Sequence, residues 1–124
     1  RNLAFPFTLT ARAENHIHGV TDLDDTIARL QAFEQAGADC LYAPGLCTET
    51  EVQAVCDAVS KPVNVLVLPG LTLAEIVDGG AQRISVGGAL TWVATKAMAD
   101  AATALRDGDS SALSARVPLQ EWFA

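Results

Sequence analysis

The chain has 124 residues, of which half are hydrophobic, a formal net charge of -7 and an isoelectric point near 4.5. This length supports one hydrophobic core and is too short for two ordinary domains. The negative charge argues against nucleic acids and anionic membrane surfaces as partners, although a single arginine in a cleft can still attract a small anion.

The cysteines and the hydropathy pattern bear on the cellular compartment in which the protein is expected. Cys40, Cys47 and Cys56 are odd in number and have no metal-ligand spacing, so we expect reduced thiols in a cytoplasmic protein. No apolar run approaches the roughly 20 residues of a membrane helix, and no signal peptide is recognisable. Because the chain begins at Arg1 and enters a strand pattern almost at once, we expect a piece of a longer protein.

Residues 7–15 alternate between apolar and polar side chains, which predicts a strand with two different faces. Arg12 and Glu14 share one of these faces and lie roughly 7 Å apart along the strand. Two interpretations follow. Glu14 neutralises Arg12 as a structural ion pair, or Arg12 binds a ligand carboxylate or phosphate while Glu14 orients it.

The rest of the chain repeats a strand followed by a helix. After a loop at residues 15–20, three capping boxes predict helix starts at Thr21-x-x-Asp24, Thr48-x-x-Glu51 and Thr72-x-x-Glu75. Their expected apolar faces are Leu23, Ile27, Leu30 and Phe33; Val52, Val55, Cys56 and Val59; and Leu73, Ile76 and Val77. We expect further strands at 39–43, 63–68 and 83–86, an Ala-rich helix at 89–105, and a short helix or docking arm at 110–124.

Four such units in series imply a parallel sheet with right-handed helical crossovers. The sheet belongs either to a small doubly wound fold or to an eight-unit barrel of which four units are present. Several polar or small residues of the strands are expected on one shared face: Thr8, Thr10, Arg12, Cys40, Tyr42, Asn64 and Ser85. This favours the barrel, because a doubly wound sheet would place Arg12 beneath a helix layer.

Four segments carry a resemblance to a known family. They are Thr10-Ala11-Arg12-Ala13-Glu14, Asp24 to Phe33, Ala36-Gly37-Ala38-Asp39, and Arg83 to Leu90. Together they resemble the isocitrate lyase/phosphoenolpyruvate mutase superfamily from about Phe5 to about Leu105. The resemblance implies an α/β fold, a (β/α)8 TIM barrel, with residues 1–108 as its C-terminal four units and 109–124 as a docking tail.

The resemblance also implies a Mg²⁺-dependent lyase that makes or breaks a carbon–carbon bond in a small 2-oxo acid or related dicarboxylate through an enolate. Arg12 then matches the family arginine that binds the substrate carboxylate, and Glu14 the acidic residue after it, both as catalytic residues. Tyr42, Asn64 and His16 are expected to line the substrate site. The metal ligands are expected in the missing N-terminal half, with none in this chain, and the assembly is expected to be a homodimer or homotetramer.

One departure from the family pattern changes the expected substrate. Isocitrate-cleaving relatives carry a glutamate at the end of the next strand, where this chain has Tyr42-Ala43-Pro44-Gly45, so we expect a simpler 2-oxo acid. The alternatives are phosphoenolpyruvate mutase-type P–C chemistry, or a non-catalytic half-barrel that holds phosphate at the turns Pro69-Gly70 and Gly87-Gly88.

Two smaller motifs are weaker candidates for chemistry. His16-Ile17-His18 has a spacing that places two imidazoles near one metal, but the sequence offers no third ligand. Cys47 follows a strand without a base beside it, so we do not expect a nucleophile there.

Overall fold

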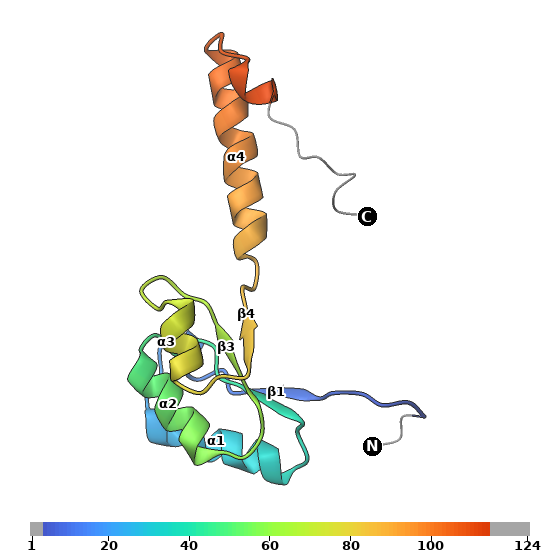
Figure 1. Cartoon of the computed structure of the whole chain (residues 1–124), viewed down its shortest axis with the longest axis vertical. Coiled ribbons are helices and arrows are strands. Elements are labelled where there is room, and N and C mark those ends of the chain that lie inside the picture. Colours follow the sequence, from blue (N-terminus) through green and yellow to red (C-terminus); the bar gives the residue numbers. More distant parts are fainter. Residues whose placement is uncertain (1–3, 115–124) are drawn as a thin grey trace. The chain divides into compact units, whose positions relative to one another are not determined.

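A computed structural model describes residues 4–114 of the chain. Its contacts divide the chain after Gly87 into two units, which are described separately. The first unit contains β1 (Thr10–Arg12), a 3₁₀ helix η1 (His16–His18), α1 (Leu23–Gln35), β2 (Cys40–Tyr42), α2 (Glu49–Ala58), β3 (Val63–Leu66), α3 (Leu73–Asp78) and β4 (Arg83–Ser85) (Figure 1). The second contains α4 (Ala89–Arg106) and a 3₁₀ helix η2 (Ser111–Ser114).

The four strands form one parallel sheet in the order β1-β2-β3-β4, which confirms the predicted parallel α/β arrangement. Helices α1, α2 and α3 lie together on one side of the strands (Figure 1). Sequential strand order with helices on one face is typical of successive barrel units, whereas a doubly wound sheet reverses its strand order and has helices on both faces.

The sheet also curls toward the face opposite α1–α3. Arg83 lies on β4, yet its Nη1 donates a hydrogen bond of 3.0 Å to Thr10 Oγ1 on β1, the strand at the other edge of the sheet. The two edge strands are therefore close enough for one arginine side chain to join them. Such curvature is what a barrel requires.

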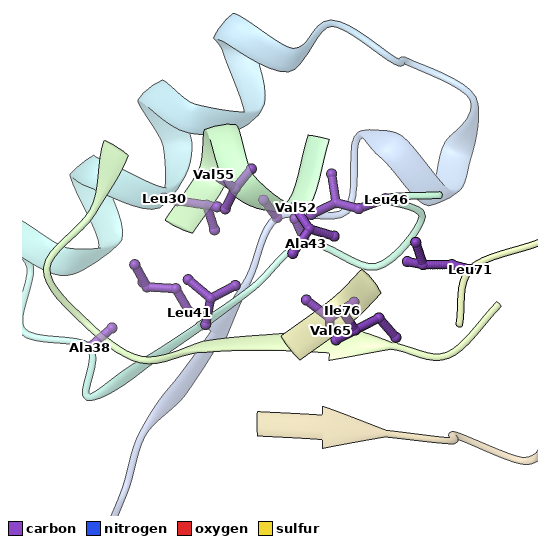
Figure 2. Packing of buried hydrophobic residues seen from close by; sticks show 12 residues of the cluster. Leu30, Ala38, Leu41, Ala43, Leu46, Val52, Val55, Val65, Leu71 and Ile76 are labelled. Carbon is purple, nitrogen blue, oxygen red and sulfur yellow. The ribbon is translucent and has the colours of Figure 1, made fainter. Parts of the chain in front are cut away.

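The hydrophobic core fills the space between the sheet and the three helices (Figure 2). Its largest fully buried hydrophobic side chains come from α1, β2, α2, β3, α3 and the loop after β2: Leu30, Leu41, Val52, Val55, Val63, Val65, Ile76 and Leu46. The odd-numbered residues of β2 and β3 point into this core. The even-numbered residues therefore lie on the opposite face of the sheet.

The helix starts follow local capping chemistry. Thr48 and Thr72 both form the predicted capping boxes, each threonine with the glutamate three residues later. The prediction for the first helix is wrong by one residue, because Asp22 rather than Thr21 is the N-cap and accepts a hydrogen bond from the Asp25 N–H at 3.0 Å. Both residue types cap helices well, so the sequence alone does not separate them.

Two predicted apolar patterns are longer than the elements that form. The strand predicted at residues 7–15 forms only at Thr10–Arg12. The side chains of Phe7 and Leu9 are 58% and 47% exposed. The hydrogen bonds to β2 begin at Leu9, whose carbonyl accepts from the N–H groups of Asp39 and Cys40, so Phe7 lies before the first of these bonds. On α3 only Ile76 is buried, while Leu73 and Val77 are exposed, because no element of the same unit packs over them.

The second unit consists of α4 and the short η2 that follows it. Helix α4 covers the predicted span, and none of its side chains is buried. The predicted arm at 110–124 is described only as far as η2, and Trp122-Phe123 lie outside the described residues. Among residues 4–114, no helix is both long and apolar enough to cross a membrane. The division of the chain at residue 108 stays a prediction.

Candidate functional site

The candidate site lies on the sheet surface opposite α1–α3, which we call the polar face. Strand pairing places the following residues on it: Thr10, Arg12, Cys40, Tyr42, Asn64, Leu66, Arg83 and Ser85. Arg12, Tyr42 and Asn64 are directly paired across β1, β2 and β3. Arg12 and Tyr42 are the last residues of their strands, so their side chains lie at the carboxyl end of the sheet, where parallel α/β folds bind ligands.

Two neighbours hold the Arg12 guanidinium. Its Nε lies 2.6 Å from Glu14 Oε1, and its Cζ lies 4.9 Å from the centroid of the Tyr42 ring. Both members of the ion pair are about half exposed. The ion pair predicted as one interpretation is therefore present, with its closest contact at Nε. Among the described residues nothing forms a hydrogen bond with Nη1 or Nη2, the two terminal nitrogens that can bind a carboxylate bidentately.

Asn64 occupies the centre of the polar face. It is 2% exposed, its Nδ2 donates to Ser85 Oγ at 3.0 Å, and its Oδ1 has no hydrogen-bond partner among the described residues. The predicted inward orientation of Tyr42 and Asn64 agrees with the strand pairing. A buried acceptor without a donor is costly, so Asn64 Oδ1 is suited to a hydrogen bond from a group outside residues 4–114.

His16 lies in η1, where the sequence predicts a loop, and its side chain is buried. Its Nδ1 is 2.8 Å from Thr26 Oγ1, which also accepts from Asn15 Nδ2 at 2.5 Å. The Thr26 hydroxyl donates its hydrogen to the Asp22 carbonyl at 2.9 Å. Because that hydrogen is used, Nδ1 of His16 must carry a proton and donate to Thr26.

This arrangement turns the His16 ring toward α1. Within the described residues the His16 side chain forms no hydrogen bond or ion pair with Arg12 or Glu14, so its predicted substrate-binding role stays a prediction. His18 is the histidine beside the ion pair, with Nε2 3.9 Å from Glu14 Oε2. The sequence did not lead us to expect His18 beside Glu14. Its position four residues after Glu14 predicts this contact only if the segment between them is helical, as η1 is.

Comparison with known proteins places the chain in a family. Residues 1–106 match the family model described as phosphoenolpyruvate phosphomutase. The chain belongs to this family. The predicted membership of the phosphoenolpyruvate mutase/isocitrate lyase superfamily is thereby confirmed.

Several relatives show the extent of the match. An oxaloacetate decarboxylase of Bradyrhizobium diazoefficiens is 35% identical over 82% of this chain and 36% of its own length. One from Rhodopseudomonas palustris BisB5 is 37% identical over 72% of this chain and 32% of its own. The chain therefore spans about a third of the length of these curated relatives.

Solved structures agree with the fold. A candidate lyase/mutase from Burkholderia cenocepacia J2315 is 51% identical with a TM-score of 0.89, over 99% of this chain and 47% of that one. An oxaloacetate acetylhydrolase in complex with oxalate has a TM-score of 0.77 at 22% identity, over 94% of this chain and 42% of that one. The second likeness concerns the fold alone.

The metal chemistry expected of this superfamily needs residues beyond the described ones. In residues 4–114 no three His, Cys, Asp or Glu side chains lie together in a group that could hold a metal ion. His16 is buried while His18 is exposed, so the structure does not bring this pair together as joint ligands. The described residues thus do not form a magnesium site on their own.

The three cysteines are free thiols. Cys47 is exposed, and the negative charge of Glu51 raises the pKa of its thiol, with Sγ 3.6 Å from Glu51 Oε2. Burial raises the pKa of Cys56 to about 11. Raised values favour the thiol over the nucleophilic thiolate, which supports the expectation that Cys47 is not a nucleophile.

The phosphate-binding alternative depends on two glycine turns. Gly70 has φ +95°, and a Cβ at this position would meet nothing within 4 Å, so the turn before α3 explains the glycine without a ligand. Gly87 and Gly88 fall on either side of the boundary between the two units. A phosphate cradle at these turns therefore stays a prediction.

Proposed function

We propose that the full-length protein is a lyase that makes or breaks a carbon–carbon bond in a small 2-oxo acid or related dicarboxylate. The observation that carries this proposal is the geometry of Arg12, whose Nε lies against Glu14 while Nη1 and Nη2 have no hydrogen-bond partner among the described residues. Relatives named oxaloacetate decarboxylase support the same substrate class. The proposed fold of the whole protein is a (β/α)8 barrel, with this chain as its C-terminal half.

In this proposal Arg12 binds and orients a substrate carboxylate through two parallel N–H···O bonds. Glu14 fixes the guanidinium through its contact with Nε. Orientation matters because the bond that breaks must align with the carbonyl that accepts its electron pair. Magnesium, when bound by carboxylates outside this chain, would stabilise the enolate charge.

The substrate is proposed to be simpler than isocitrate. The strand that ends at Tyr42 continues into Ala43 and Pro44, so no carboxylate side chain follows Tyr42 where isocitrate-cleaving relatives carry a glutamate. A compound such as oxaloacetate needs only a carboxylate site, a 2-oxo group and a second carboxylate. The cytoplasmic location and the homodimeric or homotetrameric assembly stay predictions.

A titration of the full-length protein with oxalate tests the role of Arg12. Arg12→Ala removes charge-assisted hydrogen bonds worth about 1.5–3 kcal/mol, so oxalate affinity should fall about 10- to 150-fold. The matched control is Arg29→Ala, which removes another half-exposed arginine from an ion pair, the one with Asp25 at 2.7 Å. The control should change affinity less than about 2-fold.

Unchanged oxalate affinity in a folded Arg12→Ala variant would contradict the proposal. Turnover then separates the two chemistries within the family. Loss of oxaloacetate with Mg²⁺ supports the lyase. Interconversion of phosphoenolpyruvate and phosphonopyruvate, followed by phosphorus NMR, supports the alternative that the description of the family model favours.

A further inference from the structure

We infer that Tyr42 is a positioning residue, whose ring holds the Arg12 guanidinium in the plane that presents Nη1 and Nη2 to a ligand. The inference rests on the proposed function, because it deepens the role of Arg12 at the same site. Its basis is the position of Arg12 Cζ over the Tyr42 ring, 4.9 Å from the ring centroid. The strand register supports it independently, since the two residues are directly paired on β1 and β2.

Glu14 alone does not fix the direction of the fork. One contact at Nε leaves the guanidinium plane free to turn about that bond, and the Arg12 side chain is 49% exposed. The face of an aromatic ring attracts a cation and restricts the plane of a stacked guanidinium. Glu14 at one edge and Tyr42 on one face together leave a single open edge, which carries Nη1 and Nη2.

The ring rather than the hydroxyl group performs this role. The Tyr42 hydroxyl makes no hydrogen bond to any described residue, whereas the ring contacts the cation. The side chain is also only half-buried, so it does not serve mainly to fill the core. Tyr42→Phe should therefore keep the positioning of Arg12, whereas Tyr42→Leu should lose it.

Pre-organisation explains why this contact affects ligand affinity. An arginine that samples many orientations loses conformational entropy when it binds a carboxylate, and this loss weakens binding. Holding the fork in one plane before the ligand arrives removes part of that cost. Loss of the ring should therefore weaken carboxylate binding although all N–H groups of Arg12 remain.

The test compares Tyr42→Phe and Tyr42→Leu in the full-length protein, with oxalate as the titrant. Tyr42→Phe should bind within about 2-fold of wild type, and Tyr42→Leu about 3- to 10-fold more weakly, as expected for the loss of a cation–π contact. The same leucine substitution in an Arg12→Ala background should have no further effect, because the residue that it positions is gone. Thermal unfolding of each variant verifies that it is folded.

The outcomes separate this inference from the proposed function. If Arg12→Ala loses oxalate while Tyr42→Leu binds like wild type, the positioning role is wrong and the function of Arg12 stands. If Tyr42→Phe binds as weakly as Tyr42→Leu, the hydroxyl group acts and the inference is also wrong. If Arg12→Ala keeps full affinity, the proposed function itself fails.

Discussion

Replacing Thr26 by valine tests the buried hydrogen-bond cluster behind the candidate site. Thr26 is fully buried and its hydroxyl joins Asn15 and His16, which follow Glu14, to the start of α1. Valine has nearly the same shape but no hydroxyl group. The substitution therefore removes these hydrogen bonds while leaving the packing volume unchanged.

The cost follows from the number of donors left without acceptors. Asn15 Nδ2 and His16 Nδ1 lose their partner, at about 1–3 kcal/mol each, so the free energy of unfolding should fall by about 2–6 kcal/mol. The Asp22 carbonyl still accepts a hydrogen bond from the backbone N–H of Thr26 at 3.1 Å, so losing the hydroxyl does not leave this carbonyl without a partner. Thr26→Ser keeps the hydroxyl and loses one methyl group, which costs about 1 kcal/mol.

Urea unfolding of the full-length variants measures these differences. Thr50→Val is the matched control, because Thr50 lies exposed on α2, and it should change the free energy of unfolding by less than about 0.5 kcal/mol. Nitrogen chemical shifts of His16 should show a protonated Nδ1 in wild type and in Thr26→Ser. A Thr26→Val protein as stable as Thr26→Ser would refute the account of this cluster.

Two further predictions concern the loop after β2. Gly45 has φ +108°, and the Cβ of Gly45→Ala would lie 2.9 Å from the backbone nitrogen of Ile17 in η1. Gly70 has φ +95° but open space around it, so Gly45→Ala should lower the urea midpoint of unfolding more than Gly70→Ala does. Equal decreases would contradict the close contact with η1. Glu51→Gln removes the charge that raises the Cys47 thiol pKa while a capping box still forms, so the pH midpoint of Cys47 alkylation, followed by mass spectrometry, should move down. An unchanged midpoint would show that Glu51 does not act on this thiol.

Local interactions made much of the fold predictable from the sequence. The capping boxes at Thr48 and Thr72 depend on hydrogen bonds within four residues, so their pattern is sufficient to locate both helix starts. The alternation around Arg12 correctly assigned it to the face opposite the helices, because side-chain direction in a strand follows from sequence position.

Contacts between distant segments were not predictable in the same way. The exposure of Phe7 and Leu73 depends on which elements lie beside them, and the sequence pattern carries no such information. The cluster of His16 and Thr26 forms only because η1 folds against α1, ten residues along the chain. Likewise, the ring contact between Tyr42 and Arg12 depends on the register between β1 and β2.

A crystal structure of the full-length protein with oxalate would show directly whether Arg12 binds a substrate carboxylate. We expect one oxalate carboxylate on Arg12 Nη1 and Nη2, with Glu14 still beside Nε and the Tyr42 ring still against the guanidinium. Oxalate bound elsewhere, with Nη1 and Nη2 of Arg12 turned toward a protein carboxylate, would show that Arg12 is a structural ion-pair residue and not a ligand-binding one.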